Sequence, residues 1–222
     1  MIWAVVPVKD FDRAKQRLQA ALAPRERQAL AQAMLADVLA ALKRASGLDR
    51  LVLVTRDPQA MALAQSFGCA ILTESANCGQ TSALMRALEE ARQQQAQAVL
   101  MLPADVPLIA PADVEAILKA GAEADVVLVP SRDHRGTNAM WVRPCSDFPL
   151  RFGDDSFPFH CRAARERKMR AVLLELPRLA LDVDTPEDLA ELARRYAEAP
   201  ELAAGSHTAQ LLERILWLAR FR

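Results

Sequence analysis

Leu102-Pro103-Ala104-Asp105-Val106-Pro107-Leu108 is the stretch that decides the fold of this chain. It follows the apolar run 98–101, which predicts a buried strand, and it precedes a segment beginning at Pro111 that is typical of a helix start. A carboxylate on a stiff, proline-bounded turn just past a buried strand lies where open α/β sheets bind their ligands. Asp105 therefore has two interpretations, a ligand of a divalent cation that carries phosphates or a simple turn cap.

The composition describes a globular protein without a strong overall charge. The 222 residues allow one domain with a sizeable core, and 28 basic residues balance 28 acidic ones. No global positive field indicates a nucleic-acid partner. The four cysteines form no Cys-x-x-Cys pair, which favours reduced thiols over zinc ligands or disulfides. The segment 1–9 has no basic leader and predicts a strand, so we expect a cytoplasmic protein with no membrane partner.

Strands and helices alternate along the first 130 residues. Apolar runs predict strands at 2–8, 51–54, 70–72, 98–101 and 125–129, and periodic segments predict helices at 24–44, 58–67, 79–95 and 111–121. The helix that follows Gly79 is expected to have Ser or Thr as its N-cap. This alternation predicts a mostly parallel sheet with helices on both faces.

After Pro130 the pattern becomes less regular. We expect strands at 139–142, 171–176 and 180–183, and helices at 161–168 and from Asp184-Thr185-Pro186 onward. We interpret residues 1–199 as the main domain and residues 200–222 as a helical extension. The apolar residues of 211–218 indicate that this extension packs on the body or on another subunit, which is compatible with a homo-oligomer.

Polar groups follow several of the predicted strands and should meet at one rim. The candidates are Lys9, Lys15 and Arg17, the stretch 79–82, Asp105, Thr137-Asn138 and 154–156, with Asp184 ending a further strand. Basic groups with two or three separated carboxylates suit a nucleoside triphosphate held with Mg²⁺. The chain has no Walker A, G-x-G-x-x-G or G-x-S-x-G motif, so P-loop, Rossmann and α/β-hydrolase functions lose support.

Each candidate also has a purely structural interpretation. Lys9 and Lys15 could be surface lysines, and Asp184 could cap the helix that follows it. Asp155 could belong to a turn, and His160 could serve as an ordinary hydrogen-bonding residue.

Five motifs in a fixed order carry a family resemblance. They are Val6-Pro7-Val8-Lys9 with Ala14-Lys15-Gln16-Arg17-Leu18, Pro103 to Leu108, Gly136-Thr137-Asn138-Ala139, Phe152-Gly153-x-x-Ser156-Phe157-x-x-His160, and Asp182 to Leu189. Together the motifs resemble the 2-phospho-L-lactate guanylyltransferase family of coenzyme F420 biosynthesis. The resemblance implies a single α/β domain of the nucleotidyltransferase (GT-A-like) type, a three-layer sandwich with a mostly parallel central sheet.

The resemblance also implies a reaction and its partners. GTP is the co-substrate, Mg²⁺ the cofactor, and the acceptor is a small phosphorylated carboxylic acid: 2-phospho-L-lactate, phosphoenolpyruvate or 3-phospho-D-glycerate. The acceptor phosphate attacks the α-phosphorus of GTP, and pyrophosphate leaves. No general base is required, because a phosphate dianion is already nucleophilic.

Residue roles follow from the same resemblance. Lys9, Lys15 and Arg17 would hold the triphosphate, with Asp105 as a further catalytic residue, and Asp105, Asp155 and Asp184 would bind metal. The implied substrate-binding set is Gly79, Thr137, Asn138, Gly153, Ser156 and His160. The chain departs from the family at Gly79-Gln80-Thr81-Ser82, where Gly-Leu-Asn is common.

Three other functions compete with this interpretation. A molybdenum-cofactor-type nucleotidyltransferase would share the motifs at Asp105 and Asp184 but would not predict Gly136-Thr137-Asn138-Ala139. A sugar-nucleotide-binding glycosyltransferase-like protein would carry an Asp-x-Asp motif after the central strand, which Asp105-Val106-Pro107 does not supply. A silent binding module would show scattered loss of the rim charges, whereas they are present.

Overall fold

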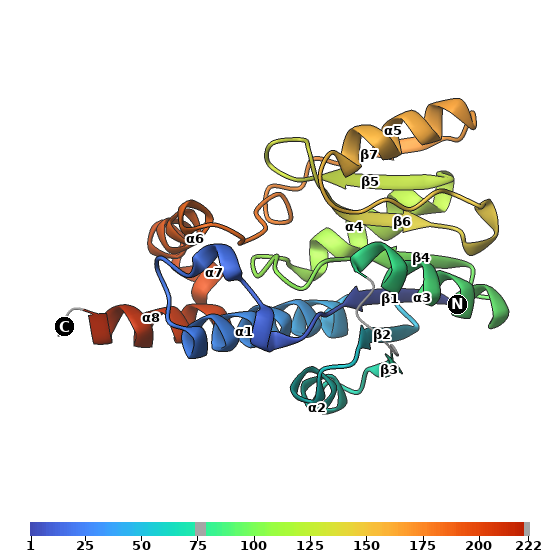
Figure 1. Cartoon of the computed structure of the whole chain (residues 1–222). Helices are drawn as coiled ribbons and strands as arrows, with labels where there is room; N and C mark the ends of the chain where they lie inside the picture. The colour runs from blue at the N-terminus through green and yellow to red at the C-terminus, as the bar shows by residue number, and fades with distance from the viewer. Residues whose placement is uncertain (74–78, 220–222) are drawn as a thin grey trace.

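A seven-stranded sheet forms the centre of the chain in the computed structural model, which describes residues 1–73 and 79–219 (Figure 1). The strands are β1 (Ile2–Pro7), β2 (Arg50–Thr55), β3 (Ala70–Thr73), β4 (Ala98–Met101), β5 (Val126–Pro130), β6 (Thr137–Val142) and β7 (Ala171–Leu173), in the order β3-β2-β1-β4-β6-β5-β7. Every pairing is parallel except the two made by β6, which runs antiparallel to β4 and β5. The expectation of a mostly parallel sheet is therefore confirmed.

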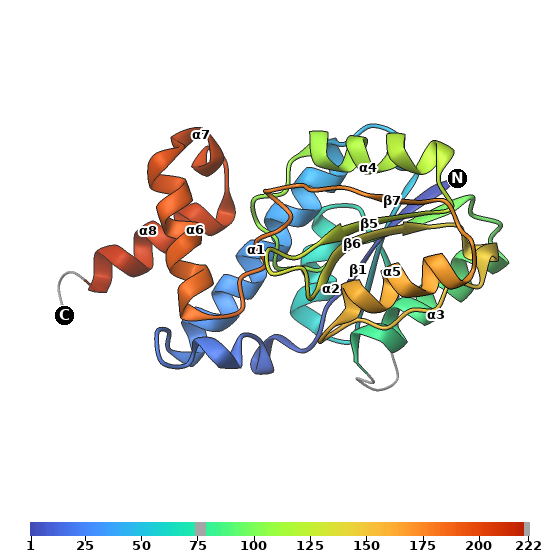
Figure 2. The same ribbon diagram turned by 90° about the horizontal axis from the view of Figure 1, so that it is seen from above.

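Helices cover both faces of this sheet. They are α1 (Pro24–Arg44), α2 (Pro58–Ser66), α3 (Gln80–Gln93), α4 (Pro111–Glu123), α5 (Ser156–Glu166), α6 (Pro186–Glu198), α7 (Pro200–Ala203) and α8 (His207–Ala219), with short 3₁₀ turns at Phe11–Arg13, Gln16–Leu18 and Pro144–Ser146. Apolar residues of α1, α2 and α4 share one core cluster, and those of α3 and α5 share another. Figure 2 shows α4 on one side of the sheet and α3 and α5 on the other, so the three-layer sandwich is confirmed.

The strand sequences explain why both faces are covered. Along β1, Ala4 and Val6 belong to the α1–α4 cluster, whereas Trp3 and Val5 belong to the α3–α5 cluster. Successive strand residues point to opposite faces, so a strand that is apolar at every position must be buried on both. All four residues of β4 are buried in the same way.

A third apolar cluster lies beyond the carboxyl ends of β1 and β4. It joins Leu18, Leu108, Leu181 and Val183 to residues of α1, α6 and α8. Asp37 of α1 accepts hydrogen bonds from the backbone N–H groups of the first two residues of α8 and so fastens that helix to the body. Because Leu108, Leu181 and Val183 belong to this cluster, it anchors the loops that carry Asp105 and Asp184.

Several helices and strands differ from the sequence-based prediction. Residues 180–183 form no strand, because this segment leaves the sheet and runs beside the loop after β4, where Val183 donates its N–H to the carbonyl of Asp105 at 3.0 Å. β7 ends at Leu173, α5 begins five residues earlier than expected, and the N-cap of α3 is Gly79 with φ of 94° instead of Ser or Thr.

Parts of two predictions fall outside the description. Cys78 lies outside the described residues, and Cys69, Cys145 and Cys161 are free thiols. The tail forms α7 and α8, but residues 220–222 and the side chains of 216–219 lie outside the description. Within the described ranges, no helix is both long and apolar enough to cross a bilayer.

Gly121 allows α4 to lie directly on the sheet. A Cβ at this position would sit 2.5 to 2.9 Å from ring atoms of Trp141 in β6. We expect Gly121→Ala to lower the free energy of unfolding by about 1–3 kcal/mol through overpacking, although alanine usually favours a helix by about 1 kcal/mol. Urea unfolding measures the change, and Ala122→Gly on the exposed face of α4 gives the propensity effect alone. A variant more stable than the wild type would contradict the prediction.

Candidate active site

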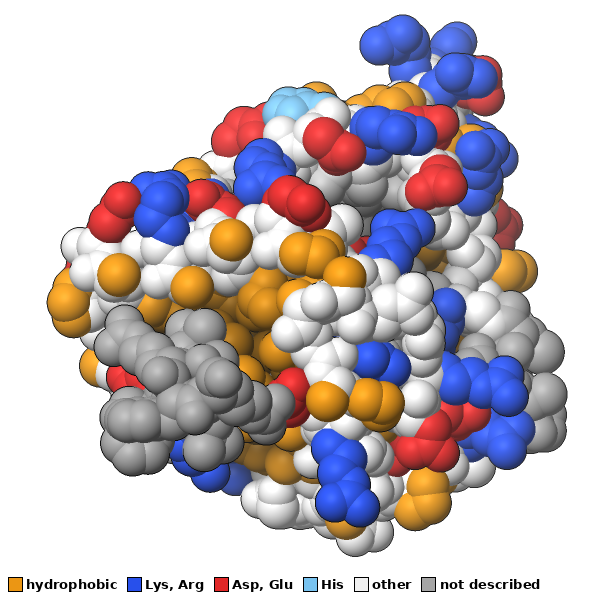
Figure 3. Space-filling model, turned by 60° about the vertical axis from the view of Figure 1, so that its left-hand side comes forward, with side chains coloured by type: hydrophobic (Ala, Val, Ile, Leu, Met, Phe, Trp, Pro, Cys, Tyr) orange, Lys and Arg blue, Asp and Glu red, His pale blue; other side chains and the backbone are white. Residues whose placement is uncertain are grey.

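The carboxyl ends of β1 and β4 bring the first polar groups to one edge of the sheet. These strands are parallel neighbours, so Lys9 after β1 and Asp105 after β4 emerge side by side. β6 runs in the opposite direction, so its first residues, Thr137 and Asn138, begin at the same edge. Figure 3 looks toward the end of the molecule that carries α6, α7 and α8, and shows charged side chains of both signs intermixed.

Lys15 joins two carboxylates that are far apart in the sequence. Its Nζ lies 2.6 Å from Asp105 Oδ2 and 2.8 Å from Asp184 Oδ1, and its side chain is only 9% exposed. Lys15 also adopts a left-handed backbone conformation, with φ of 53°. Side chains with a Cβ are strained there, and such strain concentrates at functional sites.

The electrostatics of this contact stabilise the charged forms. Burial disfavours the ammonium of Lys15, but attraction to Asp105 and Asp184 outweighs that effect, so its pKa is raised. Burial likewise opposes the charge of Asp184, but Lys15, Arg17 and Lys9 outweigh it, so the pKa of Asp184 is lowered. The other oxygen of Asp105, Oδ1, is buried, and none of the described residues hydrogen-bonds to it. An orphaned buried carboxylate oxygen is costly unless a cation or a donor completes it.

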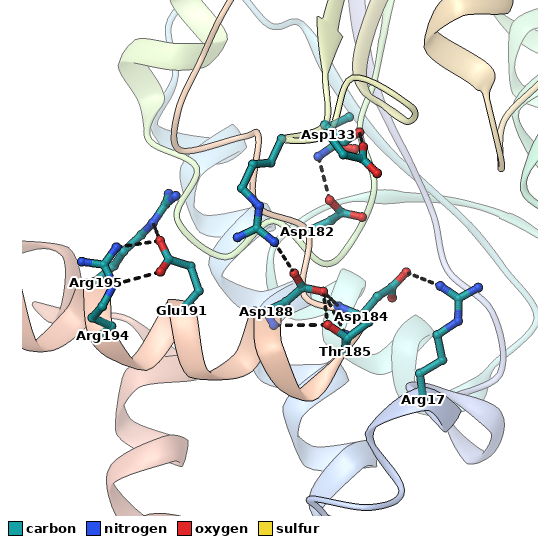
Figure 4. Close-up of polar contacts among 12 residues, drawn as sticks. Arg17, Asp133, Asp182, Asp184, Thr185, Asp188, Glu191, Arg194 and Arg195 are labelled. Carbon is teal, nitrogen blue, oxygen red and sulfur yellow. Dashed lines mark hydrogen bonds and ion pairs between the residues drawn. The ribbon is translucent and has the colours of Figure 1, made fainter.

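Asp182 also belongs to the site, although in the sequence it stood out only as the first residue of the motif 182–189. Its Oδ1 accepts from Asn138 Nδ2 at 3.1 Å, and burial, reinforced by the charges of Asp105 and Asp184, raises its pKa. Figure 4 shows Asp182 and Asp184 on the segment that leads into α6, with Arg17 reaching Asp184. The Asp-x-Asp spacing of 182 and 184 was the available signal, because alternate residues of an extended segment share a side.

Two cavities open at this edge and share a wall. The β1–α3 cavity, of about 350 Å³, lies between the end of β1, α1 and the start of α3, where Gly79 lines it. The β6–α5 cavity, of about 670 Å³, lies under the loops that precede β6 and α5. Lys9, Asp105 and Asp184 line both cavities. A group bound at the shared wall would therefore contact ligands on both sides.

The β6–α5 cavity collects most of the predicted substrate-binding residues. Thr137, Asn138, Gly153 and Ser156 line it. The backbone N–H of Thr137 donates to Ser156 Oγ at 2.9 Å, which ties the start of β6 to the start of α5. Thr81 of α3, part of the candidate stretch 79–82, accepts from the N–H of Phe152 at 2.9 Å and so links the α3 start to the Gly153 loop.

Two predicted site residues, Asp155 and His160, lie elsewhere than expected, and a third, Arg17, lies at the exposed edge of the site. Asp155 adopts a left-handed conformation, and its Oδ1 accepts from Arg135 Nε at 2.9 Å on the exposed surface. His160 is fully buried behind Thr137. Arg17 is 72% exposed and reaches Asp184 only at 3.9 Å. The structure does not bring Asp155 to Asp105 and Asp184, and among the described residues no three His, Cys, Asp or Glu side chains converge as a ready metal site.

The arrangement suits ligands that carry phosphate. Two carboxylates converge on one cation, Lys15, and within the described part of the chain the buried oxygen Oδ1 of Asp105 meets no donor. Lys9 and Arg17 lie at the same rim and supply further positive charge. Mg²⁺ in phosphoryl- and nucleotidyl-transfer sites is typically held by one or two carboxylates plus the phosphates of the substrate. Asp105 and Asp184 would supply the two carboxylates of such a site, and no third one is needed.

Sequence comparison relates nearly the whole chain to a group of guanylyltransferases. Residues 2–197 match the family model described as guanylyl transferase, CofC like. The phosphoenolpyruvate guanylyltransferase of Conexibacter woesei is 40% identical over 216 residues, which cover 96% of each chain. The 2-phospho-L-lactate guanylyltransferase of Methanothermobacter thermautotrophicus is 37% identical over 189 residues, covering 85% of this chain and 82% of that protein.

Solved structures show the same fold at low identity. A protein of Desulfovibrio desulfuricans G20, classed with the nucleotide-diphospho-sugar transferases, superposes with a TM-score of 0.81 at 19% identity, covering 99% of this chain and 96% of that one. A 4-diphosphocytidyl-2C-methyl-D-erythritol synthase of Anaerococcus prevotii DSM 20548 gives a TM-score of 0.62 at 13% identity, with coverages of 89% and 96%. These similarities establish the nucleotidyltransferase-type fold.

Replacing Lys15 should reveal its ion pairs through their pH dependence. The lowered pKa of Asp184 contributes stability above the unfolded value near 3.9, and this contribution is lost as pH falls through the folded pKa. The raised pKa of Lys15 contributes below about 10.4, and this contribution is lost as pH rises through the folded pKa. We expect Lys15→Met to cost about 1–3 kcal/mol between roughly pH 5 and 9, less than for fully buried pairs because Asp184 is 43% exposed.

Urea unfolding from about pH 3 to pH 9 measures this difference. The loss of unfolding free energy caused by Lys15→Met should become smaller below about pH 4. There the Asp184 carboxylate is protonated in the unfolded chain before it is protonated in the folded one. Lys119→Met, at an exposed position of α4, is the control for the substitution itself. A loss of unfolding free energy that is the same at every pH tested would argue against the ion pairs.

Proposed function

This chain belongs to the CofC-like guanylyl transferase family, and from that membership we propose that it transfers the guanylyl group of GTP to the phosphate of a three-carbon phosphorylated carboxylic acid. The family resemblance found in the sequence motifs is confirmed by the match over residues 2–197. The product would be a guanosine diphospho-linked acid of the kind made in coenzyme F420 biosynthesis. The observation that carries the proposal is the wall shared by the two cavities.

Nucleotidyl transfer needs two substrates to meet at one phosphorus. An oxygen of the acceptor phosphate forms a bond to the α-phosphorus of GTP, and the bond from that phosphorus to the bridging oxygen breaks as pyrophosphate leaves. The attacking and leaving oxygens lie roughly in line through the α-phosphorus, so the acceptor must approach from the side opposite to the pyrophosphate. GTP in the β1–α3 cavity and the acid in the β6–α5 cavity would meet at Lys9, Asp105 and Asp184.

The basic side chains would stabilise the charge that develops on the leaving pyrophosphate. Lys9 and Lys15 both line the β1–α3 cavity, and Arg17 lies at the mouth of the neighbouring one. Preorganised cations act strongly on developing charge because they need no reorganisation during the reaction. Catalysis would then consist of positioning and charge stabilisation.

We propose Mg²⁺ as the cofactor, held by Asp105 and Asp184 together with substrate phosphates. The residues fit the ion, because both carboxylates already converge on the Lys15 ammonium and the buried Asp105 Oδ1 has no partner in residues 1–73 and 79–219. When bound, the ion supplies Lewis-acid charge to phosphoryl oxygens. Asp182 lies beside these two carboxylates, and burial together with their charges raises its pKa, so a cation bound there would favour its charged form. Asp155 has no part in this set, because Arg135 holds it at the surface.

Phosphoenolpyruvate is the first acceptor to test. The Conexibacter woesei relative, which matches 96% of each chain, carries that substrate in its name, whereas the archaeal relative is named for 2-phospho-L-lactate. Both acids combine a carboxylate with a phosphate on a three-carbon frame. The polar lining of the β6–α5 cavity suits such a dianionic or trianionic ligand.

A direct assay tests the proposal. Purified chain is incubated with GTP, Mg²⁺ and one acid at a time: phosphoenolpyruvate, 2-phospho-L-lactate or 3-phospho-D-glycerate. We expect pyrophosphate and a guanosine diphospho-linked acid, identified by mass, with at least one acid, and no product when ATP or CTP replaces GTP. Failure of all three acids, or equal use of CTP, would refute the proposed function.

Asp105→Asn tests the metal role within the same reaction. The amide keeps the size of the side chain but removes its charge, and we expect kcat/KM to fall by about 10²–10⁴, or roughly 3–5 kcal/mol. Asp147→Asn, at an 84% exposed carboxylate that pairs with Arg92, is the matched control and should leave turnover unchanged. Near-normal turnover of Asp105→Asn would exclude Asp105 as a metal ligand.

A further inference from the structure

Lys15 binds the same two carboxylates that the proposed function assigns to Mg²⁺. Its Nζ lies 2.6 Å from Asp105 Oδ2 and 2.8 Å from Asp184 Oδ1. Such charge-assisted hydrogen bonds use the lone pairs of the carboxylate oxygens, and Mg²⁺ needs the same lone pairs, at about 2.0–2.1 Å. An ion that used only the second oxygen of Asp105 would still lie close to the ammonium, and like charges repel. The ammonium and a divalent cation therefore compete for this place.

The two carboxylates are also held together by their backbones. Val183 donates its N–H to the carbonyl of Asp105 at 3.0 Å, so the two segments are bonded directly beside the carboxylates. Leu108 and Val183 belong to the apolar cluster that anchors both segments. Asp105 and Asp184 therefore stay close to each other when the ammonium leaves, and a second cation would find them already together.

The side chain of Lys15 can move without any change in the sheet. Lys15 lies between the 3₁₀ turns Phe11–Arg13 and Gln16–Leu18, outside the strands and the long helices. A lysine carries its ammonium on a flexible four-carbon stem. Within the described part of the chain, this ammonium hydrogen-bonds only to Asp105 and Asp184. A change of side-chain torsions is therefore enough to release both carboxylates.

The two cavities differ in their access to Lys15. Among the lining residues that the structure describes, Lys15 belongs to the β1–α3 cavity and not to the β6–α5 cavity. Asp105 and Asp184, by contrast, line both. A released ammonium therefore remains on the side where the proposed function places the triphosphate. Phosphate oxygens in that cavity offer it a new partner, because a lysine ammonium binds phosphate as a point charge.

We propose that Lys15 is an internal counter-ion that exchanges places with the metal: it neutralises Asp105 and Asp184 until a triphosphate in the β1–α3 cavity draws its ammonium away and opens both carboxylates to a divalent cation. This inference rests on the proposed function, because that function assigns the metal and the triphosphate to these residues. The exchange makes the metal bind weakly alone and more tightly with the nucleotide. By linkage, metal and nucleotide strengthen each other's binding by the same factor.

The affinity of the full-length protein for Mn²⁺ alone tests the competition. Mn²⁺ takes the same oxygen ligands as Mg²⁺, and the paramagnetic resonance signal of the free ion gives the dissociation constant. We expect Lys15→Met to bind Mn²⁺ about 10- to 100-fold more tightly than the wild type, because no ammonium must be displaced. Lys9→Met removes the same charge from the shared wall but keeps the Lys15 contact, so at 0.15 M salt its dissociation constant should change less than about threefold. A Lys15→Met variant that binds Mn²⁺ no more tightly than the wild type would overturn the proposal.

Chemical labelling follows the ammonium in the wild-type protein, so the test does not depend on a variant that folds. Acetylation by an N-hydroxysuccinimide ester, read by mass spectrometry, gives the reaction rate of each lysine. The side chain of Lys15 is only 9% exposed, so we expect slow labelling in EDTA, faster labelling with saturating Mg²⁺, and slow labelling again with Mg²⁺ and GTP. Lys119, at an exposed position of α4, is the internal reference and should react at one rate throughout. A Lys15 rate that does not respond to Mg²⁺ would overturn the exchange.

Phosphoenolpyruvate in place of GTP tests the direction in which the ammonium moves. Because Lys15 lines only the β1–α3 cavity among the two, the acid should leave it as reactive as Mg²⁺ alone does. Equal protection by the acid and by GTP would overturn the assignment of Lys15 to the nucleotide side. None of these measurements needs turnover. If no acid is guanylylated, the proposed function fails by itself, whereas normal guanylylation with unchanged Mn²⁺ affinity in Lys15→Met refutes the exchange alone.

Discussion

The contact of the Lys15 ammonium with Asp105 and Asp184 is the constraint on which the site depends. It joins three segments that the sheet alone would not hold together: the loop after β1, the loop after β4 and the stretch before α6. The backbone bond from Val183 to Asp105 and the apolar cluster beneath it fix the same segments from the other side. Without a cation at this point, two carboxylates would face each other across a half-buried gap, which is unfavourable at neutral pH.

The same contact lies where two cavities meet at one edge of the sheet. Lys9, Asp105 and Asp184 separate the β1–α3 cavity from the β6–α5 cavity and belong to both. The antiparallel β6 is essential here, because its reversed direction starts Thr137 and Asn138 at the edge where β1 and β4 end. A fully parallel sheet would have placed the beginning of that strand at the opposite edge.

Local patterns in the sequence were sufficient for much of the fold. The bounds of α1 follow from a four-residue apolar period and from Pro24 at its first position, and β1 and β4 follow from uninterrupted apolar runs. The partners of a segment far away in the sequence could not be predicted from such local patterns. The segment 180–183 is as apolar as a strand, yet it pairs with the loop after β4. The site shows the same limit. Asp155 and Asp182 look equally suitable as acidic loop residues, and only the fold places Asp182 beside Asp105 while Arg135 holds Asp155 at the surface.

Positive charge explains how one edge of the sheet can hold three neighbouring carboxylates. The charges of Asp105 and Asp184 help to raise the pKa of Asp182, because the three acidic groups repel one another. Lys15 contacts Asp105 and Asp184 directly and offsets that repulsion. Lys9 lines both cavities beside them. Charges of both signs therefore surround the wall between the cavities, and an anionic ligand that carried its own cation would meet a partner for each sign there.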